Sequence, residues 1–192
     1  MALTGNYYYL LSSLPYLTFG SKPPISHANL SERIRPWLSG SSLGLFEKAR
    51  IALDSPPPEV RCKTLRSWFE FEHGLRAELA RRRTDGRDRS ERPGGASLGR
   101  ILAAVDRAFR AAHPLEGEIR LITERWEYLT ELGAVQYFNL PALIIYSLKL
   151  QLLERLSTFD EKRGLQLAES IYERNIHGGK GNDKGDDKGD QG

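Results

Sequence analysis

Residues 140–157 read LPALIIYSLKLQLLERLS, and this stretch decides the fold class. Leucine and isoleucine fall on nearly every side of the helix that the stretch predicts, and a helix without a polar face must be covered by its neighbours. Asn139 is the expected N-cap, and Pro141 falls in the first turn, where its missing N–H costs no hydrogen bond. We therefore expect a central helix over 140–157.

Several other segments carry apolar residues at three- and four-residue spacing, which is the pattern of helices with one buried face. Together with the central helix they predict an all-α fold, a compact bundle of six or seven helices. The last of these helices is expected to be capped by Asp160. The additional helices are expected over about 27–38, 42–53, 59–83, 98–112, 115–132 and 160–176.

The remaining segments are expected to be irregular. Residues 6–19 are rich in tyrosine, which favours extended structure, and are broken by Pro15. They predict an extended aromatic N-terminal arm laid over the helices, and pairing as a strand is left open. Residues 84–96 predict a mobile loop and 178–192 a disordered polar tail, because both are rich in glycine and charge. A single helical domain over 1–177 follows.

Composition excludes several classes of protein. Cys62 is the only cysteine, so neither a disulfide framework nor a multi-cysteine metal site is expected. Mean hydropathy is −0.48, and no apolar run approaches the roughly 20 residues of a membrane-spanning helix. The first residues carry no Lys or Arg ahead of their apolar stretch, so no secretory signal is expected. These features predict a cytoplasmic protein.

Residue patterns typical of catalysis are missing from the sequence. The four histidines lack metal-ligand spacing, and no glycine-rich phosphate-binding motif occurs. We therefore expect no enzyme activity, no cofactor and no metal site. One alternative is a small enzyme whose residues meet from distant segments, in a pocket lined by Arg125, Glu127 and Tyr128.

Positive charge is concentrated in one segment of the chain. Residues 61–92 hold 10 Lys and Arg against 6 Asp and Glu, whereas the whole chain has a formal net charge of +3. Such a run can be a solvated helix end, or it can bind an acidic protein, a nucleic acid or anionic lipid headgroups. No aromatic residue lies among the densest arginines, from Arg81 to Arg92, to stack on a base, so nucleic acid is not the expected partner. A basic adaptor that binds nucleic acid through 76–92 is the alternative.

Two sets of residues resemble a known family. The first is NYYYLLSSLP at 6–15 with KPPIS at 22–26, and the second is RWEYLTEL at 125–132 with YFN at 137–139 and LKLQLLER at 148–155. They resemble a bacterial family of unknown function, domain of unknown function 2764. Its members are typically encoded among the subunits of bacterial V/A-type rotary ATPases, and the resemblance covers most of 6–175.

A shorter stretch, WFEFEHGLRAELAR at 68–81, is similar to a helix of the rotary ATPase C/d subunit. That subunit is an all-helical, non-catalytic socket that joins the central stalk to the membrane rotor ring. The resemblance implies a non-catalytic cytoplasmic subunit or assembly factor of a V/A-type ATPase, with C/d-like coupling of stalk to rotor. The implied partners are stalk or rotor subunits, and the chain would meet the membrane only peripherally, through the complex.

Partner contact should come from aromatic and arginine side chains, because Trp, Tyr and Arg dominate the energetics of interfaces. The competing interpretation is that most of the aromatic residues are core. The residues predicted to bind a partner are Tyr7, Tyr8, Tyr9, Trp37, Arg76, Arg81, Arg82 and Arg83.

Overall fold

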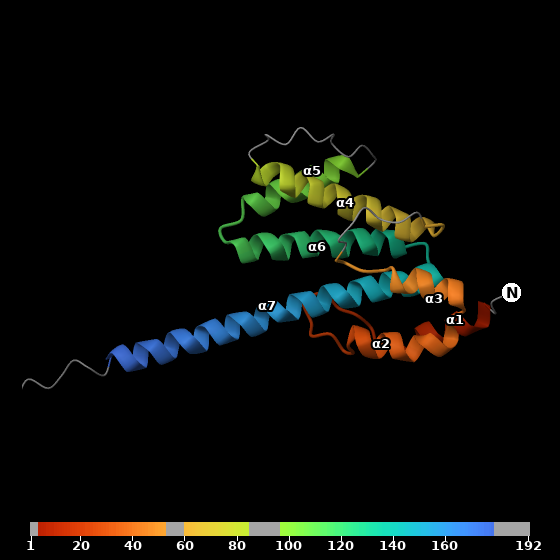
Figure 1. The fold of residues 1–192 in the computed structure, drawn as a ribbon, viewed down its shortest axis with the longest axis horizontal. Coiled ribbons are helices and arrows are strands. Elements are labelled where there is room, and N and C mark those ends of the chain that lie inside the picture. Colours follow the sequence, from red (N-terminus) through yellow and green to blue (C-terminus); the bar gives the residue numbers. More distant parts are fainter. Residues whose placement is uncertain (1–3, 53–59, 85–96, 179–192) are drawn as a thin grey trace, which may run out of the picture. The chain divides into compact units, whose positions relative to one another are not determined.

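The computed structural model describes residues 4–52, 60–84 and 97–178 (Figure 1). All regular structure in these residues is helical, with no β-strand, which confirms the predicted all-α class. The chain divides into two compact units, Met1–Ser157 and Thr158–Gly192. The helices are α1 (Thr4–Ser12), α2 (His27–Ile34), the 3-10 helix η1 (Arg35–Trp37), α3 (Gly40–Glu47), α4 (Lys63–Arg83), α5 (Leu98–Phe109), α6 (Pro114–Gly133) and α7 (Leu140–Gly178).

The first part of α7 is the core helix of the first unit, as predicted. Asn139 caps it, since its Oδ1 accepts a hydrogen bond from the Ala142 N–H at 2.9 Å. Leu148 is fully buried. Three leucines of α7 form one hydrophobic cluster with residues from α1, α2 and α3. The principal members of that cluster are Leu10, Leu30, Ile34, Phe46, Leu143, Leu150 and Leu153.

Helices α4, α5 and α6 pack together, with α5 in contact with both of the others (Figure 1). Trp68 and Phe71 of α4 are buried, and the Phe71 ring stacks on Tyr128 of α6 with centroids 4.1 Å apart. Gly117 marks the close approach of α6 to the end of α5. A Cβ atom at Gly117 would lie 2.8 Å from the backbone oxygen of Ala108.

The start of the chain differs from the prediction of an extended aromatic arm. Residues 4–12 form helix α1, because Leu10 is buried in the core and Tyr7 and Leu11 pack against the same cluster. Tertiary packing here overrides the preference of tyrosine for extended structure. The irregular segment that follows is held on α7, since the Tyr146 hydroxyl donates to the backbone oxygen of Pro15 at 2.8 Å.

Three predicted helix boundaries are also corrected. A separate last helix capped by Asp160 is wrong, since α7 continues through this residue and no proline or glycine interrupts 154–160. Helix α4 begins at Lys63, later than predicted, and α2 ends at Ile34, where η1 follows from Arg35. The predicted loop over 85–96 and the tail over 179–192 lie outside the described residues. Among the described helices, none has the length and apolar character needed to cross a membrane.

Candidate functional site

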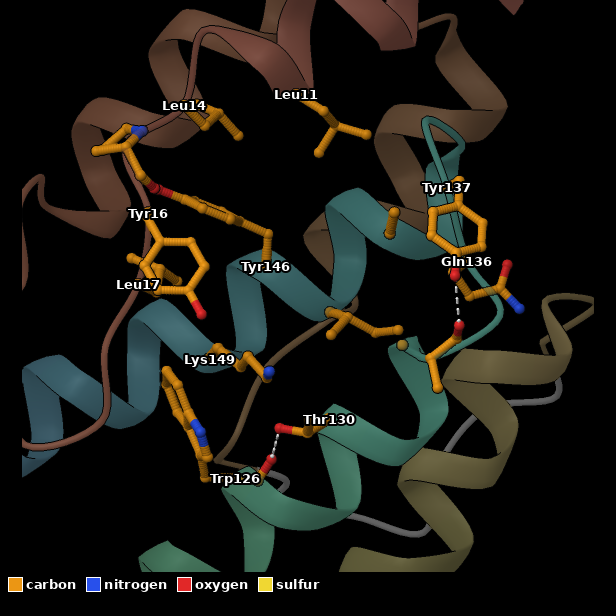
Figure 2. Close-up of a pocket in the computed structure, with 15 residues that line it drawn as sticks. Leu11, Leu14, Tyr16, Leu17, Trp126, Thr130, Gln136, Tyr137, Tyr146 and Lys149 are labelled. Carbon is orange, nitrogen blue, oxygen red and sulfur yellow. Dashed lines mark hydrogen bonds between the residues drawn. The ribbon is translucent and has the colours of Figure 1, made fainter.

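A pocket of about 580 Å³ opens in the first unit between the segment after α1, the end of α6 and the start of α7 (Figure 2). Most of its wall is aromatic and aliphatic, and none of its lining residues is acidic. We call it the aromatic pocket. Its lining residues include Leu11, Leu14, Tyr16, Leu17, Trp126, Thr130, Gln136, Tyr137, Ile145, Tyr146 and Lys149.

Lys149 is the charged residue of this pocket. Its side chain extends from α7 toward α6 (Figure 2), and the ammonium nitrogen lies 4.7 Å from the centre of the Trp126 ring. Burial lowers the pKa of Lys149, because desolvation penalises the charged amine. No carboxylate among the described residues pairs with it. The pocket therefore presents a partly desolvated cation that has no counter-ion within the described part of the chain.

Three hydroxyl groups of the pocket donate hydrogen bonds to the backbone. Tyr146 donates to Pro15, Thr130 donates to the Trp126 oxygen at 2.8 Å, and Tyr137 donates to the Ala134 oxygen at 3.0 Å. Burial also raises the pKa of the Tyr146 phenol to about 12, so this group stays protonated. Lys149 is thus the charged group of the pocket that a ligand would meet.

Exposed aromatic side chains gather beside the pocket. The Tyr8 ring lies 4.6 Å from the Phe138 ring and 5.6 Å from the Tyr9 ring, and both Tyr16 and Tyr137 line the pocket itself. Six of the eight large hydrophobic residues that are exposed in the described part of the chain belong to this group. We call these six residues, five of them aromatic and one aliphatic, the aromatic rim: Tyr8, Tyr9, Tyr16, Val135, Tyr137 and Phe138.

Phe138 adopts a backbone conformation that is unusual for its side chain. Its φ angle is 47°, in the left-handed region that glycine and asparagine adopt more readily. A left-handed aromatic residue costs on the order of 1 kcal/mol, and such strain tends to occur at functional positions. The turn between α6 and α7 therefore holds an exposed aromatic ring at a site where a smaller residue would relax the backbone.

The predicted aromatic anchors separate into two groups. Tyr8 and Tyr9 are exposed on α1 and belong to the aromatic rim, whereas Tyr7 packs against the core cluster. Trp37 ends η1, is about half exposed, and does not line the aromatic pocket. The structure thus brings Tyr8 and Tyr9 to the candidate site and leaves Trp37 outside it.

The predicted arginines do not form a single basic surface, since most of them are paired. Arg81 donates to Glu78 at 2.8 Å, and Arg82 donates to Asp106 of α5 at 2.8 Å. Arg76 donates to the buried Glu72 at 2.7 Å. Arg83 is exposed, and it lines a second pocket together with Arg76.

Sequence reasoning missed the aromatic pocket, although one signal for it exists. Lys149 is the only charged residue in 140–153, so it stands out in an otherwise apolar helix. Two residues of the suggested enzyme site are held by contacts with α4. Arg125 binds Glu72, while the Tyr128 hydroxyl donates to the Ser67 oxygen at 3.1 Å. Within the described ranges, no three His, Cys, Asp or Glu side chains are placed to hold a metal ion.

Comparison with known proteins gives no match: no family model, no curated protein and no solved structure is similar to this chain. The resemblance to domain of unknown function 2764 therefore stays a prediction from the residues that carry it.

Proposed function

We propose that this chain is a non-catalytic helical subunit or assembly factor that binds a partner protein through the aromatic rim and the aromatic pocket. The observation that carries the proposal is the concentration of exposed large hydrophobic residues around one pocket, while such residues elsewhere on the described surface are isolated. Exposed apolar patches of this kind mark sites of protein interaction, and tyrosine-rich patches supply much of the binding energy.

The strained Phe138 supports an interface at this end of the bundle. A substitution to asparagine or glycine would relax the φ angle of 47°, yet this position holds a phenylalanine that is 43% exposed. Exposure of the ring limits how much it can contribute to folding. An aromatic ring held at the surface at a conformational cost fits an anchor for a partner.

Charge complementarity defines the chemistry of that partner. The Lys149 ammonium faces a pocket without acidic lining and without a paired carboxylate among the described residues. A partner segment that brings apolar side chains to the aromatic wall and a carboxylate to Lys149 would satisfy both features. A desolvated pair of opposite charges at the centre of an interface fixes its register.

The resemblance supplies the class of partner. Domain of unknown function 2764 is associated with V/A-type rotary ATPases, so we propose that the partner is a stalk or rotor subunit of such an ATPase. The chain would then act in the cytoplasm, at the membrane face, as part of that complex. Coupling of stalk to rotor in the manner of a C/d subunit is the specific role that the weaker resemblance favours.

The test is affinity purification of the tagged chain from its native cell, with identification of the co-purified proteins. Wild type is expected to recover rotary ATPase stalk or rotor subunits, and Phe138→Asn is expected to lose them. Phe109→Asn is the matched control, since Phe109 is equally exposed, at 47%, but lies outside the rim. Recovery of nucleic acid without ATPase subunits, or full retention by Phe138→Asn, would overturn the proposal.

A further inference from the structure

Guanidinium groups from three helices converge on a second pocket, which shares no lining residue with the aromatic pocket. Its volume is about 290 Å³. Arg76 and Arg83 come from α4, Arg125 from α6 and Arg155 from α7, and we call the pocket that they line the arginine cleft.

Positive charge exceeds negative charge in this cleft. Glu72 and Glu118 are its acidic lining residues, so four guanidinium groups face two carboxylates and two positive charges are in excess. Such an excess inside a concave site raises the local concentration of anions.

Buried Glu72 fixes two of the arginines. This carboxylate is fully buried, and it accepts hydrogen bonds from Arg76 at 2.7 Å and from Arg125 at 2.8 and 3.0 Å. The bonds use Nε and Nη2 of Arg125, and its Nη1 group makes no hydrogen bond within the described residues. Arg83 forms no ion pair with any carboxylate of the described residues. A guanidinium carries five N–H donors, so pairing orients Arg125 without exhausting it.

We propose that the arginine cleft binds the diphosphate or triphosphate group of a small molecule. Guanidinium groups match phosphate oxygens in pairs of parallel hydrogen bonds, and several arginines at one site can share the charge of a phosphate chain. The volume lies at the small end of ligand sites, which fits a phosphate chain better than a whole nucleotide. Free pyrophosphate and a nucleoside diphosphate offer the same group.

Calorimetric titration of the full chain with pyrophosphate, ADP and sulfate at fixed ionic strength tests this proposal. Pyrophosphate is expected to bind at least about tenfold more tightly than sulfate, because one more anionic group reaches the arginines. Equal affinity for ADP and pyrophosphate would show that the phosphates alone are recognised, and tighter binding of ADP would identify a nucleotide as the source. Failure of pyrophosphate to bind at millimolar concentration would overturn the proposal.

A pair of double variants separates specific binding from general attraction. Arg83→Gln with Arg155→Gln removes two charges from the cleft, one of them paired with the surface carboxylate of Glu118. Arg61→Gln with Arg110→Gln removes two exposed charges outside it, one of them paired with Asp106. The first is expected to weaken pyrophosphate binding at least about tenfold and the second less than about twofold. Equal losses in both would overturn the proposal.

Chemical modification of the wild-type chain gives a readout that does not depend on folding of a variant. Phenylglyoxal reacts with accessible guanidinium groups, and the modified positions can be located by mass spectrometry. Pyrophosphate is expected to protect Arg83 and Arg155 while Arg61 stays reactive. Loss of protection at the cleft arginines under saturating pyrophosphate would contradict the assignment.

Discussion

Glu72 of α4 and Arg125 of α6 form a bidentate ion pair inside the first unit, in which Arg125 donates to the Glu72 carboxylate from Nε at 2.8 Å and from Nη2 at 3.0 Å. Arg76 binds the same carboxylate from the next turn of α4. Glu124 of α6 repeats the arrangement, since it accepts hydrogen bonds from Arg100 and Arg107 of α5. Buried glutamates paired with two arginines thus join α6 to both α4 and α5.

Glu72→Gln is predicted to destabilise the chain strongly. The substitution leaves Arg76 and Arg125 without their buried counter-ion, and breaking a buried ion pair costs about 3 kcal/mol or more. Urea denaturation followed by circular dichroism measures the free energy of unfolding. Glu47→Gln is the control, because the ion pair of Glu47 with Arg35 is exposed. This substitution is expected to leave the denaturation midpoint nearly unchanged. Equal midpoints for the two variants would contradict a structural role for Glu72.

The fold class could be predicted from the sequence because the decisive signal is local. Residues 140–157 are apolar on all sides, and only burial by other helices satisfies such a segment. Helix α1 could not be predicted in the same way. Its tyrosines favour extended structure. The packing of Leu10 and Leu11 in the cluster with α7 overrides this preference, and that packing depends on residues far along the chain.

The candidate site was largely hidden from the sequence for a related reason. Tyr16, Trp126 and Lys149 meet only after three segments pack, and helical periodicity does not say which helices become neighbours. The basic run was misleading because its partners are partly distant, as with Arg82 and Asp106. The Arg81 pair with Glu78 has helical i, i+3 spacing and is readable from the sequence.

Gly117→Ala is predicted to destabilise the packing of α6 on α5. The new Cβ would lie 2.8 Å from the Ala108 backbone oxygen, and a backbone atom cannot move aside without a shift of the helix. Overpacking of this kind costs about 1–3 kcal/mol, which exceeds the gain in helix propensity. The change is measured by thermal denaturation.

Gly44→Ala provides the matched control for that substitution. Gly44 is also helical, and a Cβ there meets nothing within 4 Å. Alanine at this position is expected to stabilise the chain by up to about 1 kcal/mol. Stabilisation by both alanines would contradict the close approach of α6 to the end of α5.

His27 is predicted to make the stability of the chain depend on mildly acidic pH. Burial lowers the pKa of His27 below 6.5, with Arg50 acting in the same direction and Glu154 opposing it. The folded state therefore favours the neutral ring, which lies 3.0 Å from the Ser147 hydroxyl. As pH falls, the unfolded chain takes up the His27 proton before the folded chain does. The contribution of neutral His27 to stability is therefore complete above pH 6.5 and is lost as pH falls through the folded pKa.

Melting temperatures measured between pH 7 and pH 5 test this expectation, because the pKa of an unperturbed histidine, roughly 6.5, lies in this range. His27→Gln is expected to flatten the dependence, and His73→Gln, which changes an exposed histidine of α4, is expected to keep the wild-type profile. A wild-type profile in His27→Gln would assign the acid sensitivity to other groups.

Lys149→Met is predicted to stabilise folding while it weakens partner binding. Burial lowers the pKa of Lys149, so the folded chain carries a charged amine that it disfavours. Methionine fills a similar volume against the Trp126 ring without that desolvation, so a small gain in stability is expected at neutral pH, reduced by the partial exposure of the amine. Because the folded state releases the Lys149 proton first, wild type should regain stability relative to the variant as pH rises through the folded pKa toward 10.5.

Thermal melts of both proteins between neutral and alkaline pH measure the first effect, and co-purification with the partner measures the second. Opposite signs for stability and binding are expected when a residue is kept for recognition at a cost to folding. Lys149→Arg retains the cation and serves as the control that should preserve the partner. If Lys149→Met lowers stability and leaves partner recovery intact, the ammonium is a structural group and the aromatic pocket does not require a carboxylate from its partner.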